Sequence, residues 1–217
     1  MSNRVSSLAA EIGASLGGAS TVPQLRAFRR TISPRVEDFD RGEILALALR
    51  LIRHSDAARY VAYELVQHHR STAAALTEEE VVALGEGLDS WHTVDGFAYT
   101  ISGRAWKRGN IDDHAVLSWT ESPDVWWRRA ALASSVILHR SPAAERHVER
   151  AMIVCEALAA DREDMVVKAL SWALREVAKA EPERVHAFLA RHDDVLHARV
   201  KREVANKLRT GLKNPRR

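Results

Sequence analysis

Residues 163–191 read EDMVVKALSWALREVAKAEPERVHAFLAR and hold two predicted helices with one break between them. Apolar side chains recur every three to four residues in the first part, which is the period of an amphipathic α-helix. The first helix is expected to end before Glu181-Pro182 and a second to begin there, because proline suits the first turn of a helix but not its interior. The stretch therefore predicts two neighbouring helices, residues 163–180 and 182–191, that pack as an antiparallel pair.

The same period runs along nearly the whole chain, without period-2 alternation and without an Asn-Gly or Asp-Gly hairpin signal. Thr77 and Glu80 have the spacing of a capping box, and Ser122-Pro123 and Ser141-Pro142 each resemble an N-cap followed by proline at the first helical position. The predicted helices are residues 4–16, 23–32, 41–53, 56–70, 78–88, 91–106, 111–119, 123–138, 142–159, 163–180, 182–191 and 194–211.

Short links between many short helices predict a stack of pairs rather than one bundle. Helices 123–138 and 142–159, followed by 163–180 and 182–191, give a period of about 40 residues, which lies in the HEAT-like range. We expect an all-α fold, a curved α-solenoid of stacked antiparallel helix pairs, as a single domain over residues 1–217. The concave face of such a stack is a natural groove for an extended partner.

Composition is that of an ordinary globular protein, apart from its aromatic and basic residues. Only 6% of the 217 residues are aromatic, yet six of these are Trp. The net charge is +3, but residues 184–217 alone hold ten Lys or Arg against three Asp or Glu. The basic helix and tail at residues 191–217 would suit a polyanion. A solvated, fraying tail is the alternative.

Several classes of protein are not expected. The single cysteine, Cys155 in the apolar run MIVCEAL, predicts a buried thiol in a reducing compartment, and excludes a disulfide framework and a Cys-rich zinc site. We read no signal peptide, and no apolar stretch approaches the length of a membrane span. No HExxH motif, glycine-rich phosphate loop or GxSxG elbow appears. We therefore expect a cytoplasmic protein that has no membrane association, metal or cofactor.

Some polar residues occupy positions where an apolar stripe is expected. Arg129 falls in the stripe of helix 123–138, and a buried guanidinium needs an anion, either a carboxylate or a phosphate. Arg128 points elsewhere, and solvation is one interpretation of it. Asp95 shares a face with Trp91 in helix 91–106. An ion pair with Arg129 that only holds the fold is the structural alternative for Asp95.

Helix 163–180 carries cations beside a tryptophan. Lys168, Trp172, Arg175 and Lys179 follow one another at steps of four, three and four residues, and so share one side of the helix. Such a surface suits phosphates and a stacked nucleotide. The alternative is a half-buried Trp172 under the aliphatic stems of the cations.

Three motifs together resemble the AlkD-like DNA alkylation repair family of HEAT-like glycosylases. They are DSWHTVD at 89–95, SWTESPDVWWRRAAL at 118–132 and VVKALSWALREVAK at 166–179, with weaker matches at TVPQLRAF, 21–28, and RYVAYELV, 59–66. The third motif is the most specific, and the resemblance covers about residues 20–190.

The resemblance implies an enzyme that hydrolyses the N-glycosidic bond of cationic alkylated purines, chiefly 3-methyladenine and 7-methylguanine, in duplex DNA during base excision repair. It implies Asp95 as the catalytic carboxylate, Trp91 and Trp172 as active-site tryptophans, and Arg129 as a phosphate ligand. It also implies that the protein grips the DNA backbone along the concave face, without base flipping. We expect a monomer, because a concave solenoid can act as one. Possible contacts to that backbone are Arg128, Lys168, Arg175 and Lys179.

The chain differs from the family pattern in two places. Ser90 and His92 stand where family members often carry a second Trp and an Asp, and no aromatic of the expected kind lies near the N-terminus. Some relatives keep the fold without glycosylase activity. A non-catalytic protein that binds distorted or branched DNA is therefore the main alternative, and a protein-interaction scaffold is the second. Trp126 or Trp127 is expected to flank Arg129, and Trp106 and Trp119 are assigned to packing.

Overall fold

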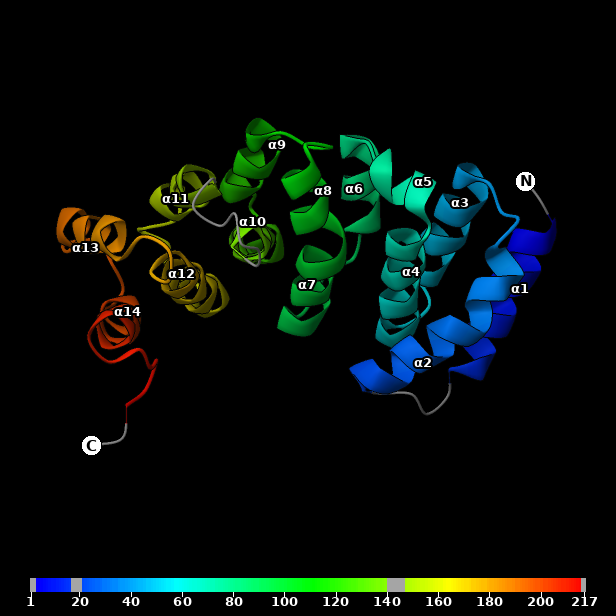
Figure 1. Cartoon of the computed structure of the whole chain (residues 1–217), viewed down its shortest axis with the longest axis horizontal. Coiled ribbons are helices and arrows are strands. Elements are labelled where there is room, and N and C mark those ends of the chain that lie inside the picture. The colour runs from blue at the N-terminus through cyan, green and yellow to red at the C-terminus, as the bar shows by residue number, and fades with distance from the viewer. Residues whose placement is uncertain (1–2, 17–20, 140–146, 216–217) are drawn as a thin grey trace. The chain divides into compact units, whose positions relative to one another are not determined.

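The computed structural model describes residues 3–16, 21–139 and 147–215, and in these ranges it is helical and has no strand (Figure 1). The first elements are α1 (Asn3–Ser15), α2 (Val22–Ile32), η1 (Ser33–Val36), α3 (Arg41–Leu51), α4 (Asp56–His68), α5 (Arg70–Ala74), α6 (Glu78–Leu84), α7 (Trp91–Phe97), η2 (Ala98–Ser102) and α8 (Gly103–Arg108). The later ones are α9 (Asp113–Ser118), η3 (Trp119–Glu121), α10 (Val125–Leu138), α11 (Val148–Ala157), α12 (Asp164–Val177), α13 (Pro182–Arg191) and α14 (Ala198–Thr210). The predicted all-α class is confirmed.

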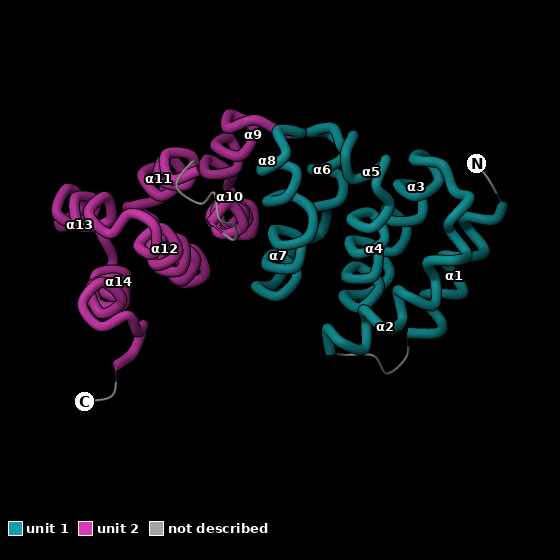
Figure 2. Tube along the Cα trace, in the orientation of Figure 1, with its two compact units in different colours: residues 1–110 teal, residues 111–217 magenta. Residues whose placement is uncertain are grey.

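The helices form two compact units, residues 1–110 and 111–217 (Figure 2). In the first unit α1 packs on α3, α2 packs on α4, and α4 also packs on α3 and α7. In the second unit α10 packs on α11 and α12, and α12 packs in turn on α14. Each unit therefore stacks neighbouring helix pairs, as the predicted helical solenoid requires. The expectation that residues 1–217 form a single domain stays a prediction, because the division into two compact units does not test it.

Polar contacts between successive pairs recur at nearly constant sequence separation. Arg4 on α1 binds Glu43 on α3, and Arg26 on α2 binds Glu64 on α4. In the second unit Arg191 on α13 binds Glu156 on α11. These pairs are separated by 39, 38 and 35 residues, respectively. A separation close to the predicted period of about 40 residues links each helix to its equivalent in the next pair.

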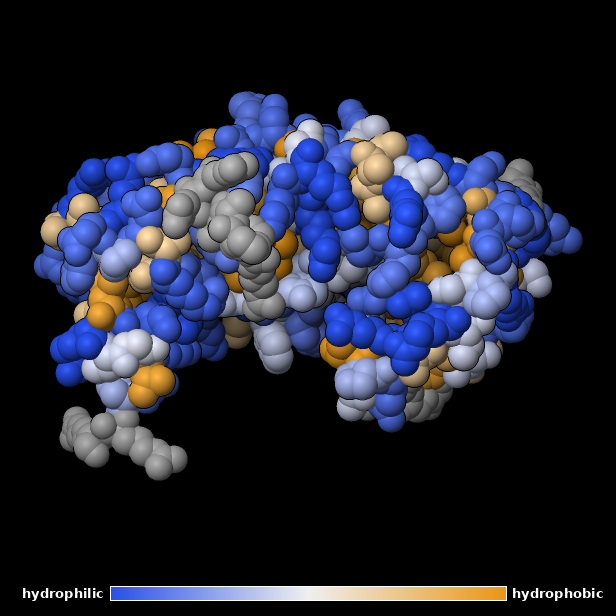
Figure 3. Space-filling model, in the orientation of Figure 1, coloured by the Kyte–Doolittle hydropathy of each residue, from blue (hydrophilic) through white to orange (hydrophobic). Residues whose placement is uncertain are grey.

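The core consists of apolar faces that the helices turn toward one another. Trp106 and Trp119 are buried, as assigned from the sequence, and Trp119 packs on Trp127 with ring centroids 5.1 Å apart. Cys155 is fully buried, and burial raises the pKa of its thiol, so the predicted buried thiol is confirmed. Hydrophilic side chains cover most of the face seen in Figure 3. Among the described helices, none is both long and apolar enough to cross a bilayer.

The predicted start of helix 123–138 is wrong. Asp124 is the N-cap of α10 and accepts a hydrogen bond from the backbone N–H of Trp126 at 2.9 Å. Ser122 and Pro123 lie before the helix, and Arg128 donates hydrogen bonds to both of their carbonyls, at 2.8 and 3.1 Å. The capping box of Thr77 and Glu80 is confirmed. The other proposed cap, Ser141-Pro142, lies outside the described residues.

Other helix ends also differ from the prediction. The predicted helix 91–106 is interrupted by η2, a π-helical turn. The short helix α5 begins at Arg70, the last residue of the predicted helix 56–70, and continues into the segment that was predicted as a link. The C-terminal helix α14 begins at Ala198 and buries Val200, Glu203 and Val204 against its neighbours. The interpretation of this end as a frayed tail is therefore wrong as far as Thr210.

Removal of the Arg59 guanidinium should destabilise the first unit. This buried side chain donates hydrogen bonds to the Tyr63 hydroxyl at 3.1 Å and to the carbonyls of Glu86 and Gly87 at 2.9 and 3.1 Å. Arg59→Met leaves these acceptors unpaired, so we expect a loss of roughly 2–4 kcal/mol in the free energy of unfolding. Urea denaturation followed by circular dichroism measures it.

The matched control is Arg53→Met, because Arg53 is exposed and only forms a surface ion pair with Glu86. Its loss should stay below about 1 kcal/mol. Equal losses in the two variants would show that the Arg59 hydrogen bonds add nothing beyond an ordinary surface pair.

Acid should weaken the attachment of α1. Hydrogen bonds from Arg35 and Arg4 lower the pKa of Glu11 and of Glu43 below the usual 4.5. A carboxyl whose folded pKa is depressed stabilises the fold above its unfolded pKa, and this contribution is lost as the pH falls through the folded pKa. Between about pH 5 and pH 3 the urea midpoint should therefore fall less in Arg4→Gln/Arg35→Gln than in the wild type. Parallel pH profiles in the two proteins would contradict this linkage.

Candidate functional site

Helix α7 presents Trp91 and Asp95 on one side. Ser90 caps the helix, and Val94 and Phe97 are fully buried in the core. Trp91 is 57% exposed, the only large aromatic among the exposed hydrophobic residues of the described ranges. Asp95 follows one turn later and is half-buried. A large exposed ring one turn from a half-buried carboxylate is more typical of a binding surface than of a core.

His92 connects this helix to its neighbour. Its Nε2 lies 2.7 Å from Oδ2 of Asp56 on α4, and its ring packs edge-on against Trp91 with centroids 5.7 Å apart. The residue that departs from the expected pattern therefore holds α7 to α4.

A π-helical turn, η2, follows α7 directly. It holds Tyr99 and Thr100, four and five residues after Asp95. π-helical turns are rare and occur frequently at functional sites. This turn sets the register between Asp95 on α7 and Arg104 on α8.

Arg129 and Arg128 on α10 have different surroundings. Arg129 is 5% exposed and donates from Nη1 to the carbonyl of Met165, at the start of α12, at 2.7 Å. Arg128 donates from Nε to Oδ2 of Asp161 at 2.8 Å, in addition to its bonds with the backbone before α10. The interpretation of Arg128 as a solvated side chain is wrong, and its contact with a backbone phosphate stays a prediction.

The cations on α12 have acidic or backbone partners. Lys168 lies 2.7 Å from Asp164, and this contact is the main cause of a lowered pKa at that carboxyl. Lys179 lies 2.6 Å from Glu176, and both lysines are exposed. Their positive charge is thus partly balanced on the same helix.

Trp172 and Arg175 are half-buried on the same helix. Arg175 donates from Nε to the carbonyl of Ser171 at 3.0 Å, and burial lowers its pKa. Ser171 in turn donates to Glu203 on α14 at 2.6 Å. The predicted site residues therefore form two sets: Trp91 and Asp95 lie in the first unit, and Arg128, Arg129, Lys168, Trp172, Arg175 and Lys179 lie in the second.

A second polar group in the first unit was missed by the sequence analysis. Glu64 on α4 is 5% exposed, and its carboxylate lies 3.3 Å from Nε of Arg26 and 4.0 Å from Nε of Arg29. Tyr60 donates its hydroxyl to Glu64 at 3.3 Å, and burial together with this carboxylate raises the pKa of Tyr60 to about 12. The signal was present, since Glu64 interrupts an apolar stripe as Arg129 does.

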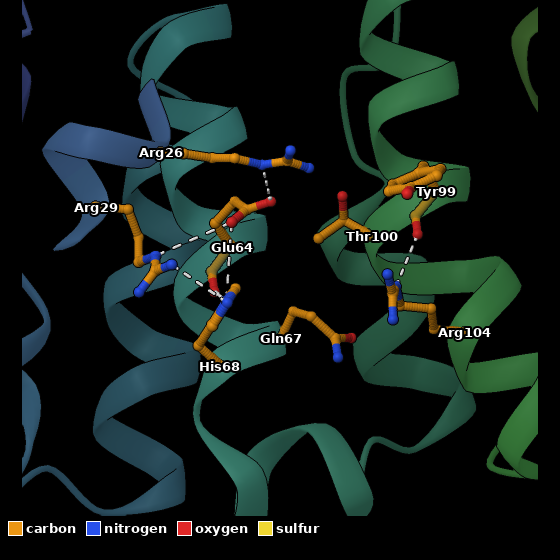
Figure 4. A pocket seen from close by; sticks show the side chains of 8 residues that line it. All are labelled: Arg26, Arg29, Glu64, Gln67, His68, Tyr99, Thr100 and Arg104. Carbon is orange, nitrogen blue, oxygen red and sulfur yellow. Dashed lines mark hydrogen bonds and ion pairs between the residues drawn. The ribbon is translucent and has the colours of Figure 1, made fainter. Parts of the chain in front are cut away.

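Glu64 lies at the side of a cavity of about 220 Å³ (Figure 4). The cavity is formed by α2, α4, η2 and α8, and its lining is strongly polar. The lining residues are Arg26, Arg29, Glu64, Gln67, His68, Tyr99, Thr100 and Arg104. No group of three or more His, Cys, Asp or Glu side chains suited to a metal occurs in the described part of the chain.

Comparison with known proteins gives one family. The family model described as "DNA alkylation repair enzyme" matches residues 19–208. The match covers most of each compact unit and includes every predicted site residue. No curated protein and no solved structure matches the chain.

Proposed function

Because the chain belongs to the DNA alkylation repair enzyme family, we propose that it is a DNA glycosylase that excises cationic alkylated purines from duplex DNA. The substrates would be 3-methyladenine and 7-methylguanine, and the reaction a hydrolysis of the N-glycosidic bond that begins base excision repair. The observation that carries the proposal is the surface of α7, where exposed Trp91 stands one turn from half-buried Asp95 within the matched residues.

The chemistry requires little from a general acid. A purine alkylated at N3 or N7 is positively charged, so it leaves as a neutral base when the bond to C1′ breaks. The deoxyribose then carries the developing positive charge, and water adds to C1′ with loss of a proton. The barrier is thus lowered chiefly by a negative charge fixed beside the sugar.

Asp95 suits that electrostatic role. Free aspartate has a reference pKa of about 3.9 and is ionised at neutral pH. A carboxylate on a regular helix is held in place before the reaction, so it costs little reorganisation when charge develops. Asp95 also lies beside an exposed indole, whose face attracts a cationic nucleotide by roughly 0.5–2 kcal/mol.

Other residues would position the DNA. Trp172 would contact the nucleotide, and Arg129 would bind a phosphate with a guanidinium held by its bond to Met165. Arg128, Lys168, Arg175 and Lys179 would contact the backbone. The lesion would stay outside a base pocket, since neither Trp91 nor Asp95 lines the 220 Å³ cavity in their unit. We further propose a cytoplasmic monomer that uses no metal or cofactor.

A non-catalytic DNA-binding protein is the second candidate. The observation that favours it is the 2.7 Å contact between His92 and Asp56, because His92 stands at a position that often carries an acid in the family pattern. This function predicts salt-dependent DNA binding without base release.

Asp95→Asn should abolish most of the base release. The substitution keeps the size of the side chain and removes its charge, so the single-turnover rate of 7-methylguanine release should fall by about 10²–10³-fold. Release from methylated duplex DNA is measured by liquid chromatography and mass spectrometry. The matched control is Asp89→Asn, an exposed aspartate just before α7, which should keep the wild-type rate.

Equal release by Asp95→Asn and the wild type would exclude the proposed role of Asp95. DNA binding by the wild type with no release of any methylated purine would favour the non-catalytic candidate. Absence of DNA binding at moderate salt would favour the remaining alternative, a scaffold for protein interactions.

Lys179→Gln should weaken DNA binding equally for all sequences. If Lys179 contacts a phosphate, the plot of log binding constant against log salt should become shallower by about one unit. Fluorescence anisotropy with a labelled duplex measures the slope. The control is Arg184→Gln, another exposed cation in a surface ion pair, with Glu149 on α11. An unchanged slope in Lys179→Gln would remove this residue from the interface.

A further inference from the structure

The cavity beside Glu64 lies entirely within the first unit and is separate from the proposed catalytic residues. Arg26 and Arg29 come from α2, and Glu64, Gln67 and His68 come from α4. Tyr99, Thr100 and Arg104 close the opposite side from η2 and α8 (Figure 4). Its volume of about 220 Å³ lies below the roughly 300–1,000 Å³ of ordinary small-molecule pockets. The space therefore suits one small group.

The lining carries more positive than negative charge. Three guanidinium groups face one carboxylate, and that carboxylate is already engaged. Glu64 accepts from Nε of Arg26 and from Tyr60, and lies near Nε of Arg29. Glu64 thus holds the two α2 arginines in place, but it can balance only one of the three positive charges, and Arg104 carries one of the charges that remain.

Arg104 has no acidic partner within the described ranges. Its Nε donates to the carbonyl of Tyr99 at 3.1 Å, and its guanidinium lies 5.5 Å from the centre of the Tyr99 ring. The nearby positive charge of Arg104 adds to burial in lowering the pKa of Arg108, so two cations crowd each other here. Figure 4 shows the Arg104 guanidinium and the Gln67 amide extending into the space opposite Arg26.

Three of the residues that line this space each have one buried polar atom without a hydrogen-bond partner in the described protein. These atoms are Oγ1 of Thr100, Oε1 of Gln67 and Nε of Arg29. Thr100 is only 3% exposed. A buried polar group without a partner costs about 1–3 kcal/mol, so such groups are rare unless a ligand or an ordered water satisfies them. The Gln67 amide can also turn over and donate.

We propose that this cavity binds a phosphate group. The Arg26 and Arg104 guanidinium groups supply charge-assisted donors from opposite sides, and the Thr100 hydroxyl and the Gln67 amide supply neutral donors. A tetrahedral oxyanion accepts from these groups together and balances the positive charge that Glu64 does not. Glu64 is a positioning residue in this site and does not touch the anion.

A neighbouring cavity indicates where such a phosphate comes from. It has a volume of about 390 Å³, shares Gln67 and His68 with the first cavity, and adds Arg70 and Arg108. Two adjoining cation-lined cavities suit successive phosphates of one strand. The assignment to a phosphodiester of DNA rests on the proposed function, whereas the phosphate chemistry does not.

The first experiment titrates inorganic phosphate into the full chain at constant ionic strength and follows backbone and side-chain amides by NMR. Saturable shifts should appear at Thr100 and at the Gln67 side chain. Arg104→Gln should weaken phosphate binding by about tenfold or more, the effect of losing one charge-assisted contact. Arg30→Gln, an exposed arginine on α2 outside the cavity, is the matched control and should bind as the wild type does.

Thr100→Val tests the site without changing its charge. Loss of the hydroxyl should weaken phosphate binding severalfold, yet the thermal midpoint measured without phosphate should not fall, because the hydroxyl has no partner in the described protein. Absence of saturable shifts in the wild type, or equal binding by the wild type and Arg104→Gln, overturns the proposal.

Duplex DNA distinguishes the two sources of phosphate. If a short duplex displaces inorganic phosphate, and Arg104→Gln makes the salt dependence of DNA binding shallower by about one unit, the ligand is a backbone phosphodiester. If phosphate binds and DNA does not displace it, the ligand is a free phosphate. Base release is measured separately, so loss of the proposed glycosylase function leaves the phosphate result intact.

Discussion

Polar contacts between equivalent helices of successive pairs hold the elements on which this protein depends. Short amphipathic helices cannot bury an apolar face alone, so each must be fixed against the next pair. Asp56 on α4 and His92 on α7 form such a contact in the first unit, and Arg129 and the Met165 carbonyl form one in the second. The buried Arg129 contact therefore helps to fix α12, which carries Trp172, and the more exposed His92 contact lies next to Trp91 on α7.

Much of the fold could be predicted from periodicity, because the buried face of an amphipathic helix appears in the sequence as apolar residues every three to four positions. The ends of the helices were harder to predict than their existence. The start of α10 was misplaced because Ser122-Pro123 resembles an N-cap followed by proline, whereas the adjacent Asp124 is the residue that caps the helix. The π-helical turn η2 was not predicted, because its residues continue the apolar period of the helix before it.

The candidate site was only partly accessible from the sequence. Glu64 is a charged residue within an apolar stripe, as Arg129 is, but it lies in a segment whose only noted feature was a weak family resemblance. The partners of Glu64 lie 38 and 35 residues before it, so its charge balance depends on packing between helix pairs. Nothing in the sequence indicated that Arg104 belongs to a site, because a single arginine near the end of the predicted helix 91–106 resembles an ordinary solvated side chain.

The π-helical turn between α7 and α8 has a consequence for how such a protein can change. A π-helical turn contains an extra residue compared with an α-helical one, and one residue corresponds to a rotation of about 100° along a helix. Loss of a single residue within Ala98–Ser102 would restore a continuous α-helix and rotate Asp95 relative to Arg104. The direction in which this carboxylate faces is thus set by the number of residues in the turn, and an insertion or deletion could redirect it without replacing any functional side chain.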